Sequence, residues 1–180
     1  PMGVEAIFDA TQRYILHHQE AAIAAVSARD WEVELQPLPN FQAIRFCDPP
    51  RTAEPVLPVL FIVPAETELH GSKGAASFEG KTPWVFWIVG AHVGQLAPGN
   101  TAAEQVRRIV TRYALALLDM LRDMAADTSG TYYANGQRIQ WGTADITPRI
   151  EYGLNYTQPN GAHLADCRIV IGAEHSEESA

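Results

Sequence analysis

The residues that most resemble a site for chemistry are Gly80, Lys81 and Thr82, which follow Ala75 at the spacing of a loose phosphate-binding loop. In such loops a helix starts directly after the glycines, so that its free N–H groups face the phosphates. Here Pro83 and a run of aromatic and β-branched residues follow instead, which predicts a strand. The first glycine is replaced by alanine, and no downstream acidic residue offers a magnesium ligand. We therefore interpret the segment as a loop that does not bind a nucleotide.

Histidine and cysteine spacing does not indicate a metal centre. His17 and His18 are adjacent on a predicted helix, so they point roughly 100° apart and cannot form an i, i+4 ligand pair. Cys47 and Cys167 are far apart and outside any C-x-x-C pattern, which favours two buried strand residues in a reducing compartment. Surface or packed positions are expected for all six histidines: His17, His18, His70, His92, His163 and His175.

Nucleophiles and carboxylate pairs also lack the context that catalysis needs. Ser72 lies between glycine and lysine, without the G-x-S-x-G strand-to-helix pattern of a nucleophile elbow. Glu32 and Glu34 alternate with apolar residues, so both face outward on one predicted strand. We therefore expect no enzymatic activity, no cofactor and no metal.

Composition bounds the class of protein further. The chain has 180 residues, enough for one domain with a substantial core, and a formal charge of −8 with scattered basic residues. Strong non-specific nucleic-acid binding needs clustered cations, so we expect none, although an acidic channel wall would let DNA slide past. The longest apolar runs, residues 55–65 and 84–93, are about half a membrane span, and acidic residues near the N-terminus argue against a signal peptide.

Hydrophobic periodicity predicts the elements of the first half. Residues 4–28 show helical spacing of apolar side chains. Strict alternation over residues 31–35 predicts a half-buried strand, which a turn at 37–40 joins to a returning strand at 41–47. Residues 56–63 and 84–93 are apolar on both faces and are predicted to pair, with a long glycine-rich loop over 66–83 between them.

The second half contains the clearest helix. Thr101 and Glu104 have capping-box spacing ahead of an apolar stripe that predicts a helix to residue 126. Asn135-Gly136 predicts a tight turn between 132–133 and 138–141. Residues 146–157, with Ile150, Tyr152, Leu154 and Tyr156 on one face, are expected to pair with 164–171 through a turn at 158–161.

These elements predict a single α+β domain over residues 1–173, followed by a flexible acidic tail at 174–180. We expect a mixed or antiparallel sheet on which the N-terminal helix and the long amphipathic helix pack. Two main helices shield one face of such a sheet fully and the other partly. The apolar remainder on strands 56–63 and 84–93 then favours association with another subunit.

The order of elements resembles that of the tail-terminator, or tail-completion, proteins of long-tailed bacteriophages. The resemblance spans residues 4–172 and is carried by the helices at 4–28 and 101–126, the strands at 56–63 and 84–93, and the hairpin at 146–171. It implies a homohexameric ring that ends the tail tube and joins it to the head connector, with DNA passing through without specific binding. It also implies a virion location in the tail or neck, assembly in the host cytoplasm and no membrane contact.

The chain is longer than compact members of that family, and residues 48–54, 66–83 and 129–143 hold the extra length. We expect the 66–83 loop to be an arm that orders on contact with another subunit or the tube, through Lys73, Phe78, Glu79 and Lys81. Alternatives are another neck or head–tail connector component, a small-molecule-binding or enzymatic α+β domain with a pocket near His92 and Trp87, and a host regulatory module that dimerises through exposed strands.

Overall fold

The computed structural model describes residues 3–50, 57–71, 77–92, 95–127, 131–132, 140–142 and 146–178. These form two helices and a mixed eight-stranded sheet, which confirms the predicted α+β class. The elements in chain order are α1 (Val4–Ser27), β1 (Ala43–Arg45), β2 (Val59–Pro64), β3 (Glu68–His70), β4 (Ser77–Ala91), α2 (Ala102–Ala126), β5 (Gln140–Trp141), β6 (Arg149–Tyr152), β7 (Tyr156–Thr157) and β8 (His163–Glu178).

Two long antiparallel strands, β4 and β8, form the centre of the sheet. They pair along their whole length, from Ser77 opposite Glu178 to Ala91 opposite Leu164. β2 pairs antiparallel with the other side of β4, and β1 pairs parallel with β2. The short strands β5, β6 and β7 all pair with the outer side of β8, so they follow one another along that edge.

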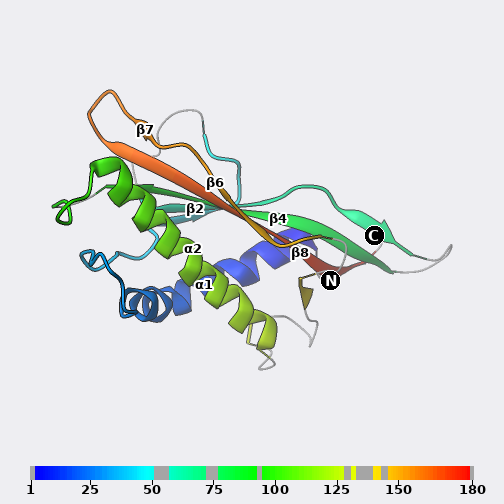
Figure 1. Cartoon of the computed structure of the whole chain (residues 1–180). Helices are drawn as coiled ribbons and strands as arrows, with labels where there is room; N and C mark the ends of the chain where they lie inside the picture. The colour runs from blue at the N-terminus through cyan, green and yellow to red at the C-terminus, as the bar shows by residue number, and fades with distance from the viewer. Residues whose placement is uncertain are drawn as a thin grey trace.

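Both helices lie on one face of this sheet (Figure 1). Side chains that alternate along β4 point into the core there, and Trp84, Phe86 and Ile88 are fully buried with residues of α1 and α2. Gly90 continues that row, and a Cβ at this position would lie 2.8 Å from Cγ1 of Val110. The missing side chain therefore lets α2 approach the end of β4 closely.

The predicted boundaries of the two helices are confirmed to within one residue. The Thr101 hydroxyl accepts the N–H of Glu104 at 3.2 Å, and the Glu104 carboxylate accepts the N–H of Thr101 at 2.7 Å. This capping box satisfies donors that the first turn of α2 leaves free. The predicted pairing of the two long apolar strands is also confirmed, as the pair β2–β4.

The predicted hairpin of residues 31–35 with 41–47 is wrong. Residues 31–35 lie alongside α2 rather than in the sheet: Arg112 donates to the Val33 carbonyl and its guanidinium lies 4.4 Å from the ring centre of Trp31. The alternation of residues 31–35 indicates that one side of this segment is buried, but it does not indicate what covers that side. Here side chains of α2 cover it. Within 41–47, the strand β1 pairs with β2 instead.

The predicted glycine-rich loop over 66–83 is also largely wrong. Residues 72–76 lie outside the described part, but β3 and the first half of β4 form a hairpin that extends the sheet, with Leu69 opposite Gly80. The flexible tail predicted from residue 174 is incorrect as far as residue 178, because Glu174–Glu178 complete β8 against β4. Glycine and polar residues take up strand conformation here because strands on both sides of β4 supply the hydrogen bonds.

The predicted pairing of 132–133 with 138–141 is not seen for the described residues of that segment. β5 pairs with β8, whereas Tyr132 packs on α1, with its hydroxyl 3.1 Å from Nδ1 of His17 and 3.0 Å from Nε2 of His18. The predicted Asn135-Gly136 turn lies outside the described residues. The 158–161 turn is confirmed, with the Gly161 N–H bonded to the Gln158 carbonyl and Gly161 at a φ of 84°.

Candidate interaction surfaces

The side chains that suggested phosphate chemistry lie inside a strand. Gly80, Lys81 and Thr82 are all part of β4, and the hydroxyl of buried Thr82 lies 2.9 Å from that of Thr67. Lys81 forms an ion pair with Glu174 of β8 at 3.7 Å. Because a helix N-terminus does not follow these residues, the segment has no ring of free N–H groups for phosphate.

Groups of three or more His, Cys, Asp or Glu side chains that could hold a metal ion do not occur within the described residues. Cys167 is buried on the helix-covered face, and burial raises the pKa of its thiol to about 11, with Arg107 opposing the rise and Asp166 adding to it. A thiol in that state is a poor nucleophile at neutral pH. No helix in the described part is long and apolar enough to span a bilayer.

An arm of three strands extends past the helices (Figure 1). It consists of β3, the first half of β4 and the end of β8, and it contains three of the four predicted contact residues. Glu79 lies opposite His70 and Ser176, and Lys81 lies opposite Glu68 and Glu174. Phe78 is in β4, and Lys73 lies outside the described residues. Glu79 and Lys81 are therefore strand residues rather than residues of the predicted loop.

The second face of the sheet is apolar; its β4 side chains are only partly covered, whereas Val59 and Phe61 of β2 on the same face are buried. Side chains opposite one another in antiparallel strands share a face, so Val85, Trp87 and Val89 of β4 face away from the helices. All three are half-buried, as is Val63 of β2, which lies opposite Val85. Within the described ranges neither helix reaches this face, which we call the open face.

On the open face, charged side chains of β6 and β8 lie on one side of Trp87. The Trp87 indole N–H donates to Oδ2 of Asp166 at 2.8 Å, and the Arg168 guanidinium lies 4.7 Å from the indole ring centre. Nε of Arg168 lies 3.9 Å from the Glu151 carboxylate, which also pairs with Arg149 at 3.5 Å. These contacts order the indole while its face stays partly accessible, as at many protein interfaces.

The β6–β7 edge carries three exposed apolar side chains that we call the edge strip. Tyr152, Leu154 and Tyr156 are 58%, 85% and 48% exposed. Burial against this edge, together with the charge of Asp166, raises the pKa of Tyr156. The sequence predicted these residues, with Ile150, to share one strand face, which the structure corrects: Tyr152 lies opposite Cys167 and Tyr156 opposite Leu164, on different faces of β8.

The backbone beneath the edge strip is firmly held. The Gly153 N–H donates to the Asp166 carbonyl at 3.1 Å, and Arg107 of α2 donates to the carbonyl of Gly153 and to Oδ1 of Asn155. The Asn155 amide in turn donates to the Ala103 carbonyl at 2.7 Å. A Cβ at Gly153 would collide with the Asp166 carboxylate, so the chain approaches β8 as closely as only glycine allows.

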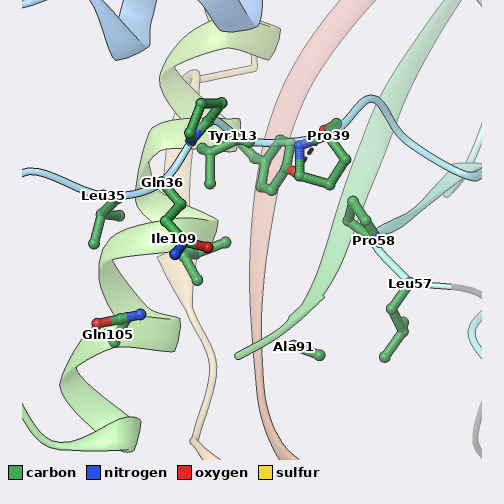
Figure 2. A pocket seen from close by; sticks show the side chains of 11 residues that line it. Leu35, Gln36, Pro39, Leu57, Pro58, Ala91, Gln105, Ile109 and Tyr113 are labelled. Carbon is green, nitrogen blue, oxygen red and sulfur yellow. Dashed lines mark hydrogen bonds between the residues drawn. The ribbon is translucent and has the colours of Figure 1, made fainter. Parts of the chain in front are cut away.

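An apolar pocket lies at the same end of the sheet as the edge strip, between α2, residues 35–39 and the start of β2. Its volume is about 100 Å³. Figure 2 shows Gln105 and Ile109 of α2 on one wall, Leu57 and Pro58 on the other, and Ala91 at the end of β4 between them. The Tyr113 hydroxyl donates to the Pro39 carbonyl at 2.6 Å and holds the segment 35–39 across the top.

This pocket lies close to one of the positions predicted from the sequence and far from the other. The Gln105 amide on its wall is 3.4 Å from Nδ1 of His92, but Trp87 faces the open side of the sheet. Residues 35–39 were predicted as strand and turn, so their role in lining a pocket was missed. The run of apolar and proline residues from Leu35 to Pro39 could have indicated that this segment lines a pocket. Proline has no backbone N–H to donate, so it can line an apolar wall without a hydrogen-bonded neighbouring strand.

No protein-family model matches the chain, and no curated protein matches its sequence.

Proposed function

We propose that this protein is a structural subunit of a bacteriophage tail, which forms a homohexameric ring at the end of the tail tube and joins the tube to the head connector. The proposal rests on the resemblance in element order and on one structural observation that supports it. That observation is the open face, where Val85, Trp87 and Val89 of β4 remain half-buried after both helices have packed on the other side, although Val59 and Phe61 of β2 on this face are buried.

A half-buried apolar face of this kind favours association over catalysis. Exposed contiguous apolar surface on a globular protein marks interaction sites. The polar groups around Trp87 are paired with one another, as Trp87 with Asp166 and Arg168 with Glu151, rather than turned toward a cleft. A rim of paired charges around an apolar centre is the usual anatomy of a protein–protein contact.

The arm supports the same function in a second way. β3, β4 and β8 continue past the helices, so the arm reaches beyond the body and can contact a neighbouring subunit or the tube. The net charge of −8 suits a ring through which DNA passes, because an acidic wall repels the phosphate backbone.

The direct test is negative-stain imaging of the purified protein, alone and mixed with tail tubes from the same phage. We expect rings of uniform diameter, bound at one end of each tube. Rings that bind the isolated head connector but not the tube would assign the chain to a neck component instead. A protein that stays monomeric and never decorates a tube end would overturn the proposal.

A matched pair of variants separates the open face from general destabilisation. Val89→Glu places a charge on the open face, and we expect it to abolish rings while the monomer stays folded. Leu16→Glu, which places the same charge at an exposed leucine of α1, is the control that leaves rings intact. Circular dichroism establishes folding in both cases. Rings formed normally by Val89→Glu would remove the open face as the supporting observation.

A further inference from the structure

Leu154 is an apolar side chain displayed on a rigid support. It is 85% exposed, yet the residues on either side of it are tied to α2 by Arg107 and to β8 through Asp166. Ordering entropy normally weakens a contact made by a loop. Because the backbone around Leu154 is already ordered, insertion of this side chain into a partner would lose little of that entropy.

The pocket has the size of one such side chain. Pockets for metabolites typically measure about 300–1,000 Å³, whereas this one measures about 100 Å³. A dry apolar cavity of roughly 150 Å³ holds one benzene molecule. The lining by Leu35, Pro58, Ile109 and the ring of Tyr113 is apolar, which suits a leucine side chain better than a polar ligand.

The strip and the pocket are different surfaces at one end of the sheet, on either side of β8 and the first turns of α2. Leu154 lies between β6 and β7, on the outer side of β8, while the pocket lies at the start of β2 and the end of β4, under residues 35–39. Ala91 of the pocket and Tyr156 of the strip both pair with Leu164 of β8, so both surfaces are near the same end of the sheet. A contact between two different surfaces of the same chain is heterologous, and it generates a ring when the rotation closes.

Charges at the two edges are complementary. Asp30, Glu32 and Glu34 are exposed in the segment that leads into the pocket, where Arg29 pairs with Asp119 and Arg112 is bonded to the Val33 carbonyl. Next to Ile109, α2 adds the exposed cation Arg108.

At the strip edge, the arginines outnumber the carboxylates. Arg149 and Arg168 share the single carboxylate of Glu151, and Arg107 lies beside Asp166. This edge therefore has three arginines and two carboxylates. The acidic segment before the pocket can face it across an interface.

We propose that Leu154 of one copy, with Tyr152 and Tyr156 beside it, inserts into the pocket of the next copy. The inference rests on the proposed ring, to which it adds one contact between subunits beside that of the open face. Leu154 is the anchor, the tyrosines cover its rim, and Glu32 and Glu34 of the receiving copy face Arg149 and Arg168 of the donor.

The test uses two variants and a matched control. Leu154→Asp removes the anchor, Ala91→Leu fills the pocket from within, and Leu16→Asp changes an exposed leucine on α1 that is 52% exposed. Light scattering measures self-association, and we expect the first two variants to weaken it by on the order of 30-fold, about 2 kcal/mol, as for a buried anchor. The control keeps the association of the unchanged chain, and thermal melting reports the fold of all three.

Mixing the two variants distinguishes a heterologous contact from a symmetric one. Leu154→Asp keeps its pocket and Ala91→Leu keeps its anchor, so an equimolar mixture is expected to give one-to-one dimers that do not grow into rings. If Ala91→Leu does not fold, a cysteine pair replaces it: Leu154→Cys and Gln36→Cys, each with Cys47→Ser, are expected to form a disulfide on mixing. Gln36 is exposed at the pocket, so its substitution spares the core.

Charge reversal tests the complementary rims. Glu34→Arg is expected to weaken association, and a chain that carries both Glu34→Arg and Arg149→Glu regains it. An absence of effect from either single reversal would overturn the assigned charge pairing.

The outcomes separate this contact from the proposed function. Normal rings from Leu154→Asp, or no cross-link between residues 154 and 36, overturn the contact and leave the ring function standing. Stable dimers from each variant alone indicate a symmetric interface and also overturn it. An unchanged chain that forms neither rings in solution nor rings on tail tubes overturns both.

Discussion

The two faces of the central sheet are built from the same strands, but they differ in what covers them. On the helix-covered face, Trp84, Phe86 and Ile88 of β4 are fully buried under α1 and α2. On the open face, Val85, Trp87 and Val89 of the same strand are half-buried. The helix-covered face therefore carries most of the burial that stabilises the monomer, and the open face keeps apolar surface for a partner.

This difference also separates stability from function along one strand. Substitutions at even-numbered positions of β4 should act mainly on folding, and substitutions at odd-numbered positions mainly on assembly. Each of the following predictions tests a part of that division.

The largest effect is expected at the two tryptophans of β4. Trp84→Ala removes a fully buried side chain and should lower the free energy of unfolding by about 3–5 kcal/mol. Trp87→Ala removes a half-buried ring, its hydrogen bond to Asp166 and its contact with Arg168, and should cost about 1–2 kcal/mol. Urea unfolding measures both. Equal losses of unfolding free energy would mean that Trp87 on the open face is as fully buried as Trp84 on the helix-covered face.

A second test uses the two cysteines, of which Cys47 is exposed and Cys167 buried. Burial raises the pKa of Cys167 from 9.0 to about 11, which alone lowers its thiolate fraction near neutral pH by about 100-fold. A thiol reagent should therefore label one cysteine rapidly in the folded chain and two after unfolding. Rapid labelling of both thiols in the folded protein would show that the helix-covered face opens readily.

The same raised pKa has a consequence for stability. The Cys167 thiol holds its proton more tightly in the folded than in the unfolded chain, so its contribution is complete below about pH 9 and is lost as the pH rises toward 11. Cys167→Ala should remove this decrease in the free energy of unfolding at alkaline pH, while Cys47→Ala should leave the decrease unchanged. Unfolding curves recorded across that range provide the measurement.

The capping box of α2 should have a smaller effect. Thr101→Ala is expected to lower the free energy of unfolding by ~1 kcal/mol, since the N–H of Glu104 loses its acceptor. The hydrogen bond from the Thr101 N–H lowers the pKa of Glu104, so the contribution of that carboxylate is present above its ordinary pKa of 4.5 and is lost as the pH falls further. Glu104→Gln should reduce the loss of unfolding free energy as the pH falls below 4.5. An unchanged pH dependence in this range would contradict a role for the Glu104 carboxylate.

The smallest effect on folding is expected on the arm. Lys81→Ala breaks a partly exposed ion pair with Glu174 and should change stability by less than about 0.5 kcal/mol. Because Lys81 is a proposed contact residue, the same variant should reduce binding to tail tubes in a co-sedimentation assay. Arg122→Ala, which breaks a comparable surface pair with Asp119 at the end of α2, is the control for binding. Equal tube binding by both variants would remove Lys81 from the contact.

The sequence predicted well those elements whose pattern is local. The capping residues Thr101 and Glu104 and the apolar stripe behind them specify α2 without reference to the rest of the chain. The turn at residues 158–161 and the strand that follows it, β8, were likewise predicted from local residues. In both cases neighbouring residues contain the whole signal.

The wrong predictions concern segments whose burial pattern was read correctly but whose neighbouring element in the fold was not the expected one. Trp31 to Leu35 alternates because one side is buried, yet Arg112 and other side chains of α2 cover that side instead of a strand. Tyr152 and Tyr156 were assigned to one face, but the break at Gly153 places them on different faces of β8. Residues 174–178 were taken as part of a frayed tail, and their pairing with β4 makes them part of β8.

The amino-acid sequence by itself determined the two helices, the pairing of residues 56–63 with 84–93 and of 146–157 with 164–171, and the lack of a phosphate-loop context after Thr82. These follow from periodicity, capping and turn chemistry, which act over a few residues. Only the tertiary structure decided that both helices share one face, that residues 35–39 line a pocket and that Leu154 stands exposed on a fixed backbone. Those features depend on contacts between distant segments, such as Arg107 with Asn155 and Tyr113 with Pro39, and local patterns carry no information about such pairs.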